Sequence, residues 1–220
     1  LEAAMSQAFL EAATSGDISK VRTMLQDDPS LARSRDENGV SVNMKTMYYG
    51  KREVAAALLE SGVELDVFEA AATGKTHRLR TVIANDASLA NAYSPDGFTP
   101  LGFAVFFAQP EVVKALLDLG AEVNTPSRES MRVTPLASAA AAKQTEIARL
   151  LIAHGANVNA RAASGHIPLH EASANGNVEL VKLLIESGAD VNAKTDDGKT
   201  PLDFATEYKC HEVIALLKES

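Results

Sequence analysis

A proline-leucine motif recurs through the second half of this 220-residue chain at a nearly constant interval. The prolines are 35, 33 and 33 residues apart, at Pro100, Pro135, Pro168 and Pro201. A second motif, Gly-Ala-x-Val-Asn, keeps the same interval and occupies residues 120–124, 155–159 and 188–192. A fixed period of this length is typical of repeat proteins, in which each unit packs only against its neighbours. We therefore expect a linear stack of similar units.

Each unit contains the signals for two short helices. Thr200 can cap a helix through its hydroxyl group, and Pro201 has the fixed φ that suits a first helical position. Gly176 lies where one helix would end and the next begin, and Gly188 follows the second helix, where a left-handed residue closes a helix end. The second helices carry apolar residues at helical spacing, as in residues 112–117. Neighbouring units must therefore cover one stripe of each helix.

The unit from Ser164 to Asn192 has the most complete pattern. It contains, in order, Gly165, Pro168-Leu169-His170-Glu171-Ala172, Gly176, Val178, Leu180-Val181, Leu183-Leu184 and Gly188-Ala189-Asp190-Val191-Asn192. This order resembles the ankyrin repeat, a turn followed by two antiparallel helices with the hallmark Thr-Pro-Leu-His-x-Ala. The resemblance implies an all-α ankyrin-repeat solenoid with short hairpin fingers between the helix pairs. It covers nearly all of the chain, which we expect to be a single domain over residues 1–220.

The residue between the paired helices defines seven units. These residues are 34, 24, 34, 35, 33 and 33 positions apart, at Gly16, Gly50, Gly74, Ala108, Lys143, Gly176 and Lys209. In the 24-residue step, residues 61–66 lead directly into Val67, so we expect the finger between the second and third units to be missing. The first three units lack the Thr-Pro-Leu signature, and Val42 replaces the proline in the second. The expected repeats span approximately residues 5–35, 36–62, 63–93, 94–128, 129–161, 162–194 and 195–220.

Charge and composition exclude several kinds of partner. The net charge is -8, and an acidic surface repels phosphate backbones, so no nucleic-acid partner is expected. No apolar run approaches the roughly 20 residues that a membrane span needs, so no membrane insertion is expected. The single cysteine, Cys210, excludes an internal disulfide, and residues 1–4 lack the features of a signal peptide. We expect a cytoplasmic monomer that begins at Met5 or is a fragment of a longer protein.

Several short motifs suggest chemistry that their context does not support. The triplets Gly74-Lys75-Thr76 and Gly198-Lys199-Thr200 lack the earlier glycine of a phosphate-binding loop, so no nucleotide is expected. His166 and His170 are four residues apart, but Pro168 lies between them and no third metal ligand is near. The resemblance implies that His170 ties turns together and that Asn124, Asn159 and Asn192 satisfy turn amides. We expect no enzyme, cofactor or metal.

The resemblance implies a partner-binding concave face made of finger tips and the exposed side of the first helices. Six of the eleven aromatic residues fall at those positions: Tyr48, Tyr49, Phe98, Phe106, Phe107 and Tyr208. Four other phenylalanines are expected in the core: Phe9, Phe68, Phe103 and Phe204. The function expected from this pattern is non-catalytic binding of a protein or extended peptide through aromatic anchors.

The third unit offers only Ala72 and Thr73 at the same positions, between two aromatic pairs. Since helices pack about 8 to 10 Å apart, the pair Tyr48-Tyr49 would stand roughly 20 Å from the pair Phe106-Phe107. We therefore expect a notch over the third unit, opened by the missing finger. A more polar extension of the same face would contain Met131, Val133, His166, Asn175, Lys199 and Glu207.

Three alternatives remain open. Phe106 and Phe107 could pack against neighbouring first helices, because adjacent helical residues point about 100° apart. The chain could be a spacer or scaffold with no discrete site, in which case the aromatic side chains would be mostly buried. The notch could instead bind a small ligand, which would require convergent polar groups around the aromatic side chains. The burial of the aromatic side chains separates the first two alternatives from the binding module.

Overall fold

The structure is a computed structural model that describes residues 2–220, and within that range it contains helices, turns and no strand. The α-helices follow one another as pairs of a first and a second helix: α1 (Glu2–Ser15) and α2 (Ile18–Asp27), α3 (Val42–Tyr48) and α4 (Arg52–Glu60), α5 (Val67–Ala72) and α6 (Thr76–Asn85), α7 (Pro100–Phe106) and α8 (Pro110–Asp118), α9 (Pro135–Ala141) and α10 (Thr145–Ala153), α11 (Pro168–Ala174) and α12 (Val178–Glu186), α13 (Pro201–Glu207) and α14 (His211–Glu219). Two 3₁₀ helices, η1 (Pro29–Arg33) and η2 (Ala87–Asn91), follow α2 and α6. The expected all-α repeat fold is confirmed.

Local signals in the sequence explain the helix ends. The hydroxyl groups of Thr99 and Thr134 accept main-chain N–H bonds at the starts of α7 and α9, each followed by a proline at the first helical position. The residue between the helices of each pair has a positive φ, including the non-glycine residues Ala108, Lys143 and Lys209. The chain therefore makes the same left-handed turn whether or not glycine is present there.

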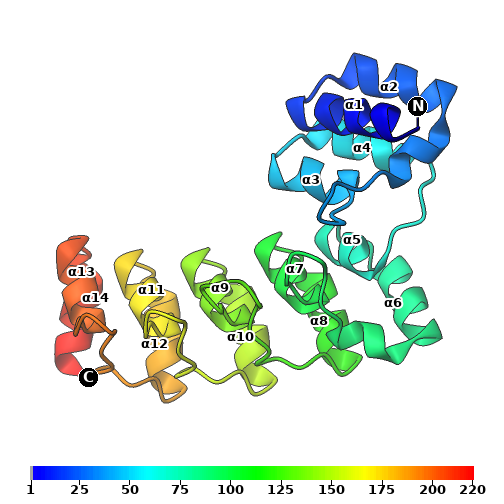
Figure 1. The fold of residues 1–220 in the computed structure, drawn as a ribbon. Coiled ribbons are helices and arrows are strands. Elements are labelled where there is room, and N and C mark those ends of the chain that lie inside the picture. Colours follow the sequence, from blue (N-terminus) through cyan, green and yellow to red (C-terminus); the bar gives the residue numbers. More distant parts are fainter. Residues whose placement is uncertain (1) are drawn as a thin grey trace.

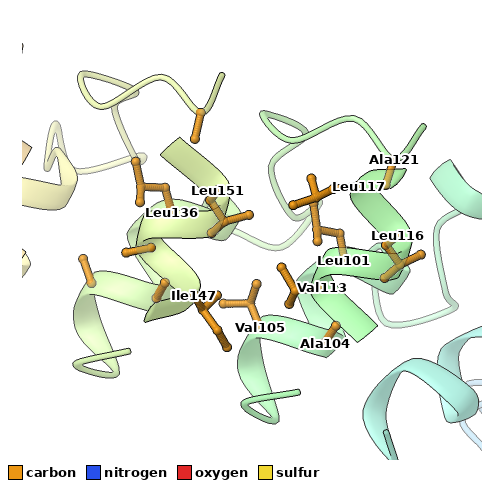
Figure 2. Packing of buried hydrophobic residues seen from close by; sticks show 14 of the residues in the cluster. Leu101, Ala104, Val105, Val113, Leu116, Leu117, Ala121, Leu136, Ile147 and Leu151 are labelled. Atoms are coloured by element: carbon orange, nitrogen blue, oxygen red, sulfur yellow. The ribbon is translucent and has the colours of Figure 1, made fainter. Parts of the chain in front are cut away.

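Adjacent helix pairs share one apolar core. Leu101, Val105 and Val113 of one pair and Leu136 and Ile147 of the next belong to the same buried cluster. Figure 2 shows Val105 of one pair and Ile147 of the next close to each other between the two pairs. Burial of a leucine-sized side chain contributes about 1.5 to 3 kcal/mol, and the two pairs pack together through α7 with α9 and α8 with α10. A single pair could not bury these residues by itself.

Polar bonds repeat in step with the core. The side chains of Asn91, Asn124 and Asn159 each donate to a glycine carbonyl of the next repeat, at 2.9 to 3.2 Å, and each also accepts a main-chain N–H there. The predicted role of asparagine side chains in satisfying turn amides is therefore confirmed for Asn124 and Asn159. For Asn192 the prediction is not confirmed, because its only hydrogen bond among the described residues is from its main-chain N–H to Asp190 Oδ1. The fingers are joined too, because the N–H groups of Arg128, Ala163 and Asp196 donate to carbonyls of the preceding finger at 2.8 to 3.1 Å.

The regular stack is interrupted at residues 61–66, which we call the joint. These residues connect α4 to α5 and are fewer than half as many as those between α10 and α11. All other neighbouring second helices pack against each other, whereas α4 and α6 make only marginal contact. The buried residues form two clusters, one in α1–α4 and one that starts at Met44 and Leu65 and continues to the C-terminus. Figure 1 shows the stack α1–α4 turned away from the row α7–α14, with α3 and α7 on the inner side of the bend.

Two of the four phenylalanines expected in the core are fully covered. Phe9 and Phe103 are buried, each in one of the two clusters. Phe68 and Phe204 are only partly buried, so the core prediction is wrong in degree for both. Phe204 lies near the end of the stack, where no further repeat covers it, and its ring contacts the rings of His166 and His170 at centroid distances of 5.1 and 5.4 Å.

One buried position departs from the leucine of the repeat signature. Asn43 follows Val42 at the start of α3, where the other units have Leu101, Leu136 and Leu169. Its side chain is fully buried, and neither amide atom has a hydrogen-bond partner. A buried polar group without a partner costs about 1 to 3 kcal/mol.

The substitution Asn43→Leu is expected to stabilise the chain by about 1 to 3 kcal/mol, because it removes that penalty and adds apolar burial. Urea unfolding monitored by circular dichroism measures the change. As a matched control, Leu101→Asn at the equivalent buried position should destabilise by a similar or larger amount. A fall in stability for Asn43→Leu would contradict the prediction.

The left-handed turn at Ala108 makes a second prediction. A left-handed residue other than glycine costs about 1 to 2 kcal/mol, and Ala108 is exposed, so Ala108→Gly should raise the thermal midpoint. The same change at Ala56, an exposed residue within α4, should lower it by about 1 kcal/mol because glycine weakens a helix interior. If Ala108→Gly lowered the thermal midpoint as Ala56→Gly does, the positive φ of residue 108 would not determine the effect of glycine there.

Candidate functional site

The two aromatic pairs predicted to wall a notch are in contact. The Tyr48 ring lies 6.0 Å from the Phe107 ring in a stacked arrangement and 6.4 Å from the Phe103 ring. The predicted separation of roughly 20 Å is therefore wrong, and the notch over the third repeat is closed. The bend at the joint is the cause, because it brings the end of α3 over α5 and onto the end of α7.

The floor of the predicted notch is covered as well. Ala72 is 0% exposed, so it offers no surface to a partner and its prediction as a contact residue is wrong. Thr73 is half-buried, and its hydroxyl group donates to the Glu69 carbonyl at 2.7 Å. Small side chains at these two positions do not open a cavity, and the Tyr48 side chain reaches beyond the third repeat to Phe107 and Asp96 of the fourth.

Tyr48 connects the helix pairs on the two sides of the joint. Its hydroxyl group donates a short hydrogen bond to the Asp96 carboxylate in the fourth repeat. Burial raises the pKa of the Tyr48 phenol, and the neighbouring Asp96 carboxylate raises it further, so the phenol stays protonated and able to donate. Two more bonds cross the joint: Ser41 donates to Glu69 at 2.6 Å, and Arg35 to Asp66 at 3.0 Å.

An apolar pocket of about 250 Å³ lies between the fourth and fifth repeats, on the side of the first helices α7 and α9. The predicted contact residues Phe98, Phe106 and Val133 meet at this pocket. The remaining lining residues are mostly small or apolar: Thr99, Gly102, Thr125, Ser127, Glu129, Thr134, Pro135, Ser138 and Ala141. We call this site the α7–α9 pocket. Phe106 is 56% exposed, and its ring meets the half-buried Phe107 edge-on at 5.0 Å.

Gly102 leaves the space that forms this pocket. Of the thirteen glycines, twelve have a positive φ, and Gly102, within α7, is the exception. Its backbone conformation therefore does not require glycine. A Cβ atom at Gly102 would lie 3.5 Å from Thr99 Oγ1 and 3.8 Å from Phe98 Cδ1, and both of these residues line the pocket. Glycine in a helix interior costs about 1 kcal/mol relative to alanine. The glycine that lines the pocket therefore also lowers the stability of α7.

Other predicted contact residues are exposed but lie outside the pocket. Tyr49 and Tyr208 are each 60% exposed, and Met131 is exposed in the finger that precedes Val133. Four residues of the predicted polar extension, His166, Asn175, Lys199 and Glu207, are engaged within the fold. His166 Nδ1 lies 2.8 Å from Glu171 Oε1, Asn175 Nδ2 donates to the Ala140 carbonyl at 2.8 Å, and Lys199 Nζ donates to Glu207 Oε2 at 2.7 Å.

His170 has the structural position that the resemblance implies. It is fully buried, its Nδ1 accepts the Ile167 N–H at 3.1 Å, and its Nε2 lies 3.1 and 3.2 Å from the carbonyls of Ala193 and Lys199. Nε2 must therefore carry the proton. Burial lowers the pKa of this imidazole, which keeps it neutral and able to join the sixth repeat to the seventh. Residues 2–220 hold no group of three or more His, Cys, Asp or Glu side chains arranged for a metal ion.

A larger opening lies at the joint, where α4 and α6 separate. It measures about 610 Å³, is open to solvent, and is lined by Leu59, Val63, Glu64, Leu65, Gly74, Lys75, Thr76, His77 and Arg78. None of these residues was predicted as a contact residue, and none of the exposed aromatic side chains reaches it. The short connection at the joint thus leaves an opening beside the second helices α4 and α6, not at the predicted notch on the first helices. None of the helices described is long and apolar enough to cross a membrane.

Sequence reasoning missed the small residues and the carboxylate of the α7–α9 pocket. Gly102, Ser138 and Glu129 line it, yet only the aromatic and β-branched side chains were predicted. One signal was available for Gly102, since a glycine within a predicted helix is unfavourable and no turn is expected there. Ser138 and Glu129 carry no comparable signal, because small and charged residues are common on any exposed helix or finger.

Comparison with known proteins gives a consistent result. The family model for ankyrin repeats, three copies long, matches residues 67–162, 126–195 and 161–220. These matches together cover residues 67–220, well over half of the chain, and begin at the first residue of α5, directly after the joint.

Three curated relatives illustrate the similarity. The chain is 32% identical to an ankyrin repeat protein of Fowlpox virus, over 69% of this chain and 36% of that protein. It is 32% identical to ankyrin repeat and SOCS box protein 11 of Homo sapiens, over 50% of this chain and 33% of that protein. It is 27% identical to serine/threonine-protein kinase VIK of Arabidopsis thaliana, over 60% of this chain and 29% of that protein. The chain spans about a third of the length of these relatives, so their activities are not assigned to it.

The buried imidazole of His170 predicts a pH dependence of stability. Its pKa in the folded chain is below the ordinary value of 6.5, so below pH 6.5 the unfolded chain takes up a proton that the folded chain resists. The stability difference between the wild type and His170→Asn should be about 1 to 3 kcal/mol near pH 7.5 and should shrink as the pH falls through 6.5. Urea titrations at pH 7.5, 6.5 and 5.5 measure it. A constant difference would show that His170 does not control this pH dependence.

Proposed function

Because this chain belongs to the ankyrin-repeat family, whose repeats are generally protein-protein interaction modules, we propose that it binds another protein through the concave side of its first helices. The binding element of the partner is an extended segment, and the chain acts as a monomer without catalysis. The α7–α9 pocket receives one bulky side chain of that segment. The exposed rings of Tyr49, Phe106 and Tyr208 supply further contact area along the same face.

The observation that carries this proposal is the pocket over Gly102. An apolar recess beside a half-exposed phenylalanine is the arrangement in which an anchor side chain becomes fully desolvated. Burial of a leucine or phenylalanine side chain contributes about 1.5 to 3 kcal/mol. One anchor cannot offset the entropy lost on association, which is estimated at about 4 to 15 kcal/mol, so rim contacts are required. The exposed aromatic residues along the face can provide them.

Two alternatives are less well supported. A spacer with no site would have its aromatic side chains mostly buried, whereas Tyr49, Phe106 and Tyr208 are each more than half exposed. Pockets for small ligands usually measure about 300 to 1,000 Å³ and contain convergent polar groups. The α7–α9 pocket is smaller than this range, and the opening at the joint has the volume but is wide open to solvent.

Substitutions at Gly102 test the proposal without damaging the fold. Gly102→Leu places a side chain in the pocket at a helical position where leucine is favourable, so partner capture from the source cells should fall at least tenfold. Gly102→Ala should raise the stability by about 1 kcal/mol and weaken capture less. Circular dichroism and quantitative mass spectrometry of the captured proteins give the two measurements.

The matched control adds bulk away from the concave side. Ser19 is exposed on the second helix α2, so Ser19→Phe adds an apolar side chain outside the proposed face and should leave capture unchanged. Equal capture by the wild type and Gly102→Leu, with both proteins folded, would contradict the proposed site.

A further inference from the structure

The α7–α9 pocket has one charged group on its rim, and that group has no cation. Of the twelve residues that line the pocket, only Glu129 is ionisable. Within residues 2–220, its carboxylate forms no ion pair, and its one side-chain hydrogen bond comes from Ser127 Oγ at 3.3 Å. The neighbouring cations form no ion pair with it: the Arg128 guanidinium lies over the Tyr93 ring at 3.7 Å, and Arg132 is in none of the ion pairs of residues 2–220.

A second unneutralised carboxylate lies at the tip of the preceding finger. Asp96 accepts hydrogen bonds from the hydroxyl groups of Tyr48 and Ser94, and it also has no ion pair among the described residues. Asp96 lies two residues before Phe98 in one finger, and Glu129 lies four residues before Val133 in the next. Phe98, Glu129 and Val133 all line the pocket. The net charge of -8 adds an attractive field for a cationic partner.

We infer that the segment bound in the α7–α9 pocket is an extended peptide with one bulky apolar side chain flanked by lysine or arginine. The apolar side chain lies between Phe98, Phe106 and Val133, and a basic side chain pairs with Glu129. This inference rests on the proposed function and specifies the partner of the same site. The pocket is smaller than the usual range for a small-molecule site, which favours a single side chain as the occupant.

The spacing of the fingers sets the spacing of the basic residues. Neighbouring repeats are about 8 to 10 Å apart, which is the usual distance between packed helices. An extended chain advances about 3.3 Å per residue, so three residues of peptide span one repeat. A basic residue opposite Asp96 and another opposite Glu129 should therefore be about three positions apart, with the apolar anchor between them.

A displayed library of random 12-residue peptides tests this specificity on the full chain. Peptides are selected on the wild type at low salt, and those that also bind the Gly102→Leu variant are discarded. The remaining peptides are expected to share a large apolar residue with lysine or arginine within three positions of it. A synthetic peptide of the most enriched sequence then serves as the probe for fluorescence anisotropy.

Charge variants measure the contribution of Glu129 to binding of that peptide. Glu129→Gln should weaken binding roughly two- to fivefold, as for a partly exposed ion pair, and the loss should diminish at high salt. Glu129→Lys should weaken it further. The matched control Glu186→Gln changes an exposed carboxylate on the second helix α12 and should have no effect.

The outcomes separate this inference from the proposed function. The inference would be overturned if the enriched peptides required an open pocket but lacked basic residues. It would also be overturned if Glu129→Gln bound the peptide as tightly as the wild type. Either result would leave the proposed concave binding site intact. Enrichment of acidic peptides would overturn it as well. If every enriched peptide still binds the Gly102→Leu variant, both the inference and the proposed function fail.

Discussion

Each repeat of this protein can bury its apolar residues only against its neighbours, and the rest of the structure depends on that constraint. The helices are too short to form a core within one pair, so the side chains of α7 and α8 are completed by those of α9 and α10. Asparagine bridges and finger-to-finger bonds follow the same nearest-neighbour pattern. Any irregularity between two repeats therefore changes the direction of the whole stack.

The joint at residues 61–66 is such an irregularity. Its short connection leaves α4 and α6 nearly unpacked, while the first helices α3 and α5 stay in contact. The stack bends toward the first helices, and Tyr48 crosses to Phe107 and Asp96. Polar bonds from Ser41 and Arg35 replace the asparagine bridge that is absent here. The aromatic side chains near the joint therefore hold the bend, and the proposed binding surface lies further along the stack, at α7 and α9.

Stability and the proposed recognition make opposite demands on α7. Leu101, Phe103, Ala104 and Val105 are buried and maintain the core, whereas Gly102 weakens the helix and leaves a recess on the exposed side. Alternate sides of one short helix thus have separate roles. This division is possible because a solenoid uses only one side of each first helix for packing between repeats, which leaves the other side free to vary in shape and charge.

The sequence by itself determined the repeat type and the ends of helices such as α12 and α13, because these depend on local spacing, capping and turn chemistry. The resemblance to the ankyrin repeat implied the structural role of His170. The sequence also predicted that Phe98, Phe106 and Val133 lie on one face. It did not predict that Tyr48 contacts Phe107, that Ala72 is covered, or that the pocket forms over Gly102. Those features depend on the angle between repeats, which results from the packing of side chains from several helices at the joint. Only the tertiary structure decides that angle, because no single repeat contains the contacts that set it.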